Sequence, residues 1–322
     1  MRTFILKRIL HTIPLLLGVS LLAFIIIHIA PGDYLSLQLE NPNVRPESVE
    51  RMRHAFGLDR PWYLQYFYYI RQIFLHLDFG ESFPRHQPVF TAIKGGFGNT
   101  LLLASAAAVI TWGLAVPLGI IAAVKQNTWV DRLAGWVAFV GLSTPEVLAG
   151  LGAIIFAART HWFPINGIHS IDYDTYSAVG KVADVLYHLI LPALVLGSIT
   201  MASRMRQMRG NLLEVLRADY VTTARAKGLS EFVVIQRHAV RNAINPIITL
   251  FGYTLGSLVA GSFIVEIVFG WPGLGMLTLD AYKTHDTWLV MGSLLMGSSV
   301  LILGNLVADL LLVLADPRIS YN

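Results

Sequence analysis

The sequence predicts an all-α membrane protein whose chain crosses the bilayer several times. Of the 322 residues, 55% are hydrophobic and only 14% are charged, and the mean hydropathy is +0.59. An ordinary soluble domain carries about 25% charged residues, so this composition indicates that lipid surrounds most of the chain. Six apolar segments are close to the length of about 20 residues that a spanning helix needs. They are residues 9–29, 100–124, 133–157, 188–203, 246–268 and 288–314.

The distribution of basic residues predicts the orientation of these spans. Arg2, Lys7 and Arg8 precede the first apolar segment, which is about long enough to span and is followed by a poor cleavage site, so we expect it to be retained. With a cytoplasmic N-terminus, the short inner segments and tails hold 14 Lys and Arg, against three in the two short outer loops. This bias places both termini in the cytoplasm. The net charge of +4 therefore reflects membrane topology, and nucleic acid is not an expected partner.

Residues 31–98 form a long insertion after the first span, which we expect on the extracytoplasmic side. Within it, Pro46–Leu58 is predicted to be a short helix because Pro46 suits a first turn and Gly57 suits a stop. A second helix is predicted over Tyr63–Leu77. We expect its aromatic stripe to pack against the spans or the lipid interface, the alternative being contact with a substrate or partner. The stripe consists of Tyr63, Phe67, Ile70 and Phe74.

Two acidic residues lie within or beside apolar segments, where an ionisable side chain is costly and marks a candidate functional site. Glu146 follows Ser143-Thr144-Pro145, and either lines a path through the spans, pairs with a partner, or has a structural role. Glu266 lies near the outer end of the fifth segment and either supports a gate or anchors the following loop. That loop, Phe269–Gly275, has three glycines and a proline, which favour tight turns over another helix.

The sequence offers little that indicates catalysis or metal binding. His161, His169 and His188 lie in or near one outer loop, but their spacing matches no helical ligand pair, so we interpret them as loop or interfacial residues. Gly95-Gly96-Phe97-Gly98 precedes an apolar span instead of following a strand, which argues against nucleotide binding there. The chain contains no cysteine, which excludes disulfides and thiolate metal sites.

The basic loop over residues 204–245 is the most informative part of the chain. Asp219 is predicted to cap a helix over residues 220–227, and Gly228 to end it in the left-handed conformation. Small side chains at Thr223 and Ala224 leave room for another protein. A second helix is expected from Ser230, with Phe232, Ile235, Gln236 and Ala239 on one face, before Asn245 caps the fifth span at Pro246. Two short helices between two spans predict a stiff docking elbow, the alternative being a solvated loop that only sets orientation.

This loop resembles the coupling loop of ABC importer permeases, in particular those of the dipeptide and oligopeptide subfamily. The residues that carry the resemblance are Asp219, Tyr220, Thr222, Thr223, Ala224, Arg225, Ala226, Lys227, Gly228 and Leu229. Further motifs agree in order and spacing along the chain. They are Ala30-Pro31-Gly32-Asp33, Gly57-Leu58-Asp59 with Pro61-Trp62, Leu77 through Ser82, Glu266 through Gly275, and Asp316-Pro317-Arg318.

The loop departs from the general importer pattern of Glu-Ala-Ala, three residues and Gly. Thr222, Thr223 and Ala224 occupy the first three positions, and Gly228 matches the glycine. Later in the loop, His238, Val240 and Arg241 stand where an Ile, Leu and Pro signature belongs. These departures are similar to the peptide-importer version of the loop.

The resemblance implies a type I ABC importer transmembrane fold with six spanning helices and an extracytoplasmic insertion. It implies a permease subunit of the bacterial inner membrane, not an enzyme, that imports dipeptides or oligopeptides. The implied partners are a second homologous permease, two cytoplasmic ATPase subunits that bind ATP and Mg²⁺, and an extracytoplasmic solute-binding protein; this chain itself binds no cofactor. The resemblance also places an outer docking loop at Phe269, Gly270, Trp271, Pro272, Gly273, Leu274 and Gly275, the alternative being a plain re-entrant or interfacial turn.

These expectations divide the chain into four parts. Residues 1–30 hold the N-terminus and first span, 31–98 the extracytoplasmic segment, 99–315 the permease core with coupling loop 204–245, and 316–322 a cytoplasmic tail. An alternative function is import of nickel chelates, opines or other non-peptide solutes by the same architecture. A membrane enzyme or signalling scaffold is a more remote alternative, because it needs polar catalytic groups converging inside the spans.

Overall fold

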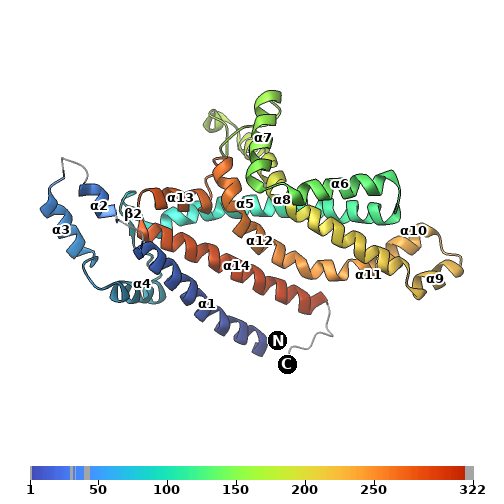
Figure 1. Cartoon of the computed structure of the whole chain (residues 1–322), viewed down its shortest axis with the longest axis horizontal. Helices are drawn as coiled ribbons and strands as arrows, with labels where there is room; N and C mark the ends of the chain where they lie inside the picture. The colour runs from blue at the N-terminus through green and yellow to red at the C-terminus, as the bar shows by residue number, and fades with distance from the viewer. Residues whose placement is uncertain (1, 30–31, 33, 40–43, 316–322) are drawn as a thin grey trace. The chain divides into compact units, whose positions relative to one another are not determined.

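The computed structural model describes residues 2–29, 32, 34–39 and 44–315, and these are almost entirely helical (Figure 1). A single two-stranded antiparallel sheet within them pairs β1 (Glu81–Ser82) with β2 (Gln87–Pro88). The all-α fold class is therefore confirmed. Most of the Ala30 to Asp33 motif and the whole of Asp316-Pro317-Arg318 lie outside the described residues, as does the predicted tail.

The longest helices coincide with the predicted apolar segments, and shorter helices connect them. In chain order they are α1 (Arg2–Ile29), α2 (Tyr34–Leu39), α3 (Pro46–Ala55), α4 (Trp62–His76), α5 (Val89–Val124), α6 (Trp129–Ser143), α7 (Glu146–Thr160), the 3-10 helix η1 (Tyr173–Thr175), α8 (Ala178–Leu216), α9 (Asp219–Ala226), α10 (Glu231–Val233), the π-helix η2 (Val234–Val240), α11 (Arg241–Ala243), α12 (Asn245–Val268), α13 (Leu274–Lys283) and α14 (Thr287–Ala315).

Among the described residues, α1, α5, α8 and α14 are long and apolar enough to cross a membrane, and α6 with α7 make a fifth span if counted together. Five of the six predicted apolar segments each lie within a single helix, including 246–268 within α12. The count of six spans stays a prediction. The apolar part of α12, Gly256–Val268, is shorter than the other spanning helices.

The prediction that segment 133–157 is one continuous helix was wrong. The segment is divided between α6 and α7, which meet at a bend of 109°. Thr144 at the break is extended, with φ of −90° and ψ of 118°, and Pro145 follows it. A residue before proline is disfavoured in the helical conformation, which explains why the helix stops there although both flanks are apolar.

The chain divides into two compact units, and each is described separately. The first comprises residues 1–100 and 272–300, and the second comprises 101–271 and 301–322. The core of the first unit joins the start of α5 to α13 and α14. Its buried members are Val89, Ile93, Leu274, Leu277, Ala281, Leu289 and Val290.

The predicted helices of the insertion are present in the first unit as α3 and α4, and Gly57 has the positive φ of +66° that suits a stop. Of the predicted stripe, Ile70 packs against the core of this unit, whereas Tyr63, Phe67 and Phe74 are exposed. Tyr69 is buried instead, against Phe24 of α1 and Met291 of α14. The inward face of α4 is therefore set by tertiary contacts with α1 and α14.

Candidate functional site: the loop between α8 and α12

The returning half of the loop, from η2 to the start of α12, packs onto α8 in the second unit. Met208 and Leu212 of α8 form a buried core with Ala239, Ala243 and Ile247. The amide nitrogen Nδ2 of Asn211 also donates to the backbone oxygen of Ala243, at 3.3 Å. Burial of these apolar side chains ties the loop to the spanning helix that precedes it.

The tip of the loop is cross-linked within itself. Val221 and Ala224 of α9 are buried against Val234 of η2. On the surface, the Arg225 guanidinium donates to both carboxylate oxygens of Glu231, at 3.1 and 2.7 Å, and this contact lowers the pKa of Glu231. A bidentate contact of this kind fixes orientation, although its exposure limits its contribution to stability. The tip is therefore a compact pair of short helices.

The helix boundaries of the loop correct two predicted caps. The residue before α9 is Ala218, so Asp219 lies in the first turn and makes no capping hydrogen bond. Its carboxylate is still favourable there because the first turn is the positive end of the helix. The residue before α12 is Ile244, so Asn245 is likewise inside the helix. Gly228 does end α9 with a φ of +79°, as predicted.

Two side-chain predictions for the loop were also wrong. Ala224 is buried against Val234, so only the neighbouring Thr223 is exposed for the approach of another protein. The predicted common face of the second helix does not exist, because Phe232 and Gln236 are exposed whereas Ala239 is fully buried. The cause is the π-helical turn η2, whose wider winding buries Val234 and Ala239, five residues apart.

A partly buried ion pair joins the first turn of α6 to α8. The Arg209 guanidinium donates to both oxygens of the Asp131 carboxylate, at 2.6 and 2.8 Å. The same carboxylate accepts from the backbone nitrogen of Asn127, at 3.0 Å. Sequence reasoning missed this pair because its members are 78 residues apart and each resembles an ordinary loop charge.

Removing one member of this pair is expected to destabilise the permease core more than removing both. Asp131→Ala leaves the partly buried Arg209 guanidinium without its partner, at an expected cost of about 1–3 kcal/mol. Thermal unfolding of Asp131→Ala, Arg209→Ala and the double variant, purified in detergent, measures the coupling between the two side chains. If the stability losses of the two single variants add up to the loss of the double variant, the two side chains are not coupled.

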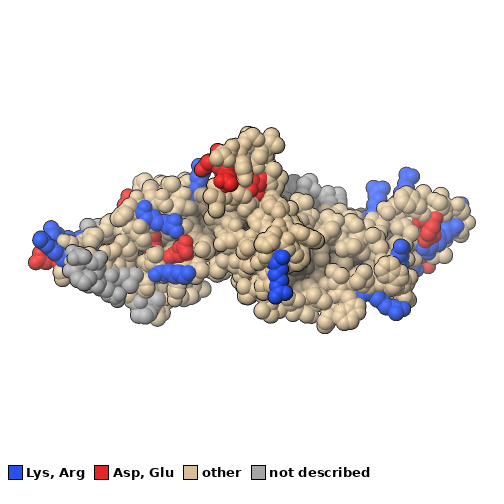
Figure 2. All heavy atoms as spheres, turned by 90° about the horizontal axis from the view of Figure 1, so that it is seen from above, with Lys and Arg blue, Asp and Glu red and all other residues tan. Residues whose placement is uncertain are grey.

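Three large apolar side chains of the loop are exposed. Phe232, Tyr220 and Leu229 are 73%, 45% and 42% exposed. Several polar or small residues of the resemblance are exposed beside them. These are Thr222, Thr223, Arg225, Ala226, Lys227 and Gly228. Figure 2 shows Lys and Arg side chains, with acidic groups among them, over the segment that carries α9 and α10. The loop therefore presents these three exposed apolar side chains, here called the ridge, among basic residues.

The two predicted acidic site residues lie elsewhere in the second unit. Glu146 is the first residue of α7 and is half buried, with its Oε1 close to Gly261 of α12. Glu266 of α12 is fully buried, and its Oε1 accepts from the Oγ of Ser262 at 2.9 Å. One carboxylate thus lies against α12 and the other belongs to α12, in different surroundings.

The predicted outer loop is more buried and more helical than the sequence suggested. Phe269 and Trp271 are buried, and α13 already begins at Leu274, so Leu274 and Gly275 are helical. In the second unit, the backbone nitrogen of Gly167 donates to the Phe269 oxygen at 3.0 Å. Pro272 is the exposed residue at the turn.

His169, in the loop between α7 and α8, and His188, within α8, have local structural contacts. His188 is buried with its Nδ1 2.9 Å from the backbone oxygen of Asp184. The Asp184 carboxylate accepts from the backbone and side chain of Ser170, and His169 stacks on Tyr173. No group of three or more His, Cys, Asp or Glu that could hold a metal occurs in the described part of the chain.

Comparison with known proteins decides the family. The family described as "Binding-protein-dependent transport system inner membrane component" matches residues 115–321, and the N-terminal region of such membrane components matches residues 1–104. The chain belongs to this family. The permease is 36% identical over 323 residues to the oligopeptide transport system permease protein AppB of Bacillus subtilis, covering all of both chains. It is 35% identical over 340 residues to the dipeptide transport system permease protein DppB of Escherichia coli K12, again over all of both.

One further relative supports the family assignment, and one solved structure supports the fold. The glutathione transport system permease protein GsiC of Shigella flexneri is 38% identical over 325 residues, covering all of both chains. Among solved structures, the inward-facing methionine ABC transporter MetNI has a chain that superposes with a TM-score of 0.53 at 15% identity, covering 72% of the permease and 99% of that chain. The resemblance to ABC importer permeases is confirmed, and the permease is a membrane transport subunit, not an enzyme.

Proposed function

We propose that the permease forms half of the membrane pathway of an ATP-driven importer of dipeptides and oligopeptides. Support comes from full-length relatives whose names specify oligopeptide and dipeptide transport. Its proposed partners are a second homologous permease, two cytoplasmic ATPase subunits that carry ATP and Mg²⁺, and an extracytoplasmic solute-binding protein. The proposed location is a bacterial inner membrane, with both termini in the cytoplasm.

The coupling role of loop 204–245 rests on one observation, which is the exposed ridge of Tyr220, Leu229 and Phe232. The returning segment of the same loop is packed on Met208 and Leu212 of α8 through Ala239, Ala243 and Ile247. A loop that is exposed in one part and fixed to a spanning helix in another can transmit motion as a lever. Closure of the ATPase subunits against the ridge would therefore move α8.

The remaining site residues are proposed for the pathway and its outer face. Glu146 and Glu266 are proposed to line or support the pathway, because both lie in apolar helices against α12 or within it. The segment Phe269–Gly275 is proposed to meet the binding protein, with Pro272 as its exposed member. The division of the chain into four parts, with boundaries after residues 30, 98 and 315, is also part of this proposal.

Replacing the ridge aromatic is expected to release the ATPase subunits without harming the fold. Phe232→Ser removes the most exposed ring of the loop, and Phe232 belongs to neither buried cluster of the loop. The expected result is at least a tenfold loss of ATPase co-purifying with the tagged permease. The matched control is Trp162→Ser, since Trp162 is 67% exposed in the outer loop. Equal retention by both variants would contradict the coupling role.

Uptake separates the peptide proposal from its alternatives. Cells that contain the complete importer are expected to accumulate radiolabelled dipeptide in an ATP-dependent manner, and Phe232→Ser is expected to stop this. Accumulation of a nickel chelate or an opine, without dipeptide, would overturn the proposed substrate class while leaving the importer assignment intact.

A further inference from the structure

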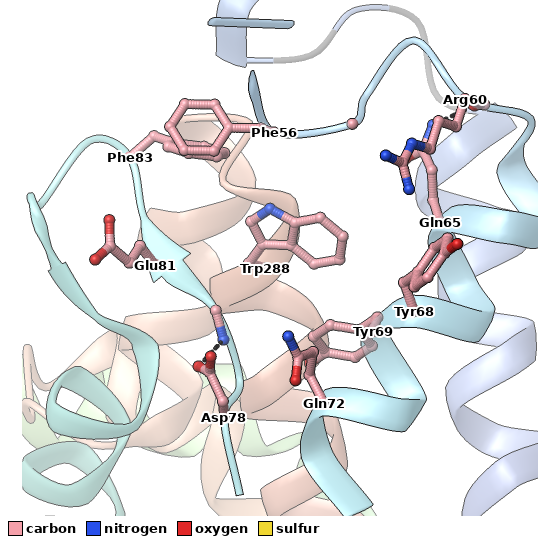
Figure 3. Close-up of a pocket in the computed structure, with 12 residues that line it drawn as sticks. Phe56, Arg60, Gln65, Tyr68, Tyr69, Gln72, Asp78, Glu81, Phe83 and Trp288 are labelled. Atoms are coloured by element: carbon pink, nitrogen blue, oxygen red, sulfur yellow. Dashed lines mark hydrogen bonds between the residues drawn. The ribbon is translucent and has the colours of Figure 1, made fainter. Parts of the chain in front are cut away.

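A cavity of about 390 Å³ lies in the first unit, between the end of α3, α4, β1 and the start of α14 (Figure 3). Aromatic rings form much of its wall. Tyr69 stacks on Trp288 with ring centroids 5.0 Å apart, and Phe56 lies tilted against Phe83 at 4.4 Å. Concave, largely aromatic cavities of this size are typical of small-ligand sites.

Opposite charges stand on opposite sides of this cavity. Figure 3 shows Arg60 on one side and the carboxylates of Asp78 and Glu81 on the other, with the Trp288 ring between them. The Arg60 guanidinium lies over the Tyr68 ring, 5.1 Å from its centroid. Asp78 is held by the backbone nitrogen of Gly80, which donates to its Oδ1 at 2.8 Å. The charges are thus positioned by local contacts and still line the cavity.

A buried hydroxyl in the same wall independently indicates a ligand. Tyr69 is only 5% exposed, and its hydroxyl has no hydrogen-bond partner among the described residues. Burial, followed by the neighbouring Asp78 carboxylate, raises the pKa of Tyr69, so the hydroxyl stays protonated and able to donate. Buried polar groups are nearly always satisfied, so a polar atom of a bound molecule is the natural partner here.

We propose that this cavity is an extracytoplasmic binding site for a short zwitterionic peptide, with Arg60 facing its carboxylate and Asp78 and Glu81 facing its ammonium group. The aromatic wall takes an apolar side chain of the peptide, and the Tyr69 hydroxyl bonds its polar backbone. Charge-assisted hydrogen bonds at both ends give selectivity for free termini. This inference rests on the proposed peptide transport and adds a site on the permease itself, between the insertion and the start of α14.

The test measures calorimetric binding of three probes to the detergent-purified importer complex without its binding protein. The probes are the dipeptide Ala-Phe, N-acetyl-Ala-Phe, which lacks the ammonium group, and Ala-Phe-amide, which lacks the carboxylate. Each capped probe is expected to bind about tenfold more weakly than Ala-Phe. Tyr69→Phe keeps the ring but is expected to weaken binding of Ala-Phe.

Variants assign each terminus to its side of the cavity. Arg60→Gln is expected to make Ala-Phe and Ala-Phe-amide bind alike while the penalty for N-acetylation remains. The double variant Asp78→Asn, Glu81→Gln is expected to make Ala-Phe and N-acetyl-Ala-Phe bind alike, while the penalty for amidation of the carboxylate remains. Arg71→Gln, at an exposed arginine of the same helix α4, is the matched control and should bind like the unmodified complex.

The outcomes distinguish this site from the proposed function. If the importer accumulates dipeptide but the complex binds Ala-Phe no better than the capped probes, the site proposal is overturned and transport stands. Binding that is indifferent to the Arg60 and Asp78 with Glu81 variants also overturns it. Binding with the expected pattern in a complex that transports no dipeptide would support the site and overturn the proposed transport.

Discussion

Gly228→Val is expected to abolish ATP-driven uptake while leaving the permease inserted in the membrane. Gly228 has a φ of +79°, which a β-branched residue adopts only at a cost of about 1–3 kcal/mol. A side chain added there meets nothing within 4 Å, so the strain comes from the backbone alone. Relief of that strain redirects the chain at Leu229 and moves Phe232, which disrupts the ridge. Dipeptide uptake and ATPase co-purification measure the effect.

Two control variants separate backbone strain from other causes. Gly228→Asn is expected to keep substantial uptake, because asparagine enters the left-handed conformation more readily than other residues. Gly135→Val makes the same chemical change inside α6, where the backbone is helical and an added side chain also meets open space. Normal uptake by Gly228→Val would contradict the role of this turn, as would an equal loss of uptake in Gly135→Val.

The sequence predicted those features that depend on local patterns. Apolar segments of spanning length became helices, Pro46 opened α3, and Gly228 ended α9. Each depends on a few neighbouring residues, through apolar length, a fixed proline φ or the conformational freedom of glycine. The family resemblance was also visible in the sequence, because it depends on short motifs that occur in a fixed order along the whole chain.

Features set by tertiary packing were not predictable from these patterns. The π-helical turn shifted the inward face of the loop, so Ala239 became buried and Phe232 exposed. The Asp131 and Arg209 pair requires α6 to lie against α8, which no local pattern encodes. The break at Thr144-Pro145 was visible in the sequence, but apolar residues on both sides favoured a single helix.

Gly119→Val is expected to cause the largest loss of folded permease. An added Cβ at Gly119 of α5 would lie 2.7 Å from the Cβ of Met208 and 2.8 Å from the backbone oxygen of Met205. A backbone oxygen cannot rotate away, so α5 and α8 must separate. Overpacking costs about 1–3 kcal/mol where side chains can adjust, and we expect more here. Membrane yield and the unfolding temperature in detergent measure the loss.

Gly113→Val is the matched control, because Gly113 lies in the same helix and an added Cβ there meets nothing within 4 Å. Both variants change helix propensity and hydropathy equally, so a difference between them reports the close approach of α5 to α8, as small residues allow between membrane helices. Equal yield and equal unfolding temperature would contradict this approach. Met208 also belongs to the core that holds Ala239 and Ala243 of the loop, so separation of the helices removes the support of the coupling elbow as well.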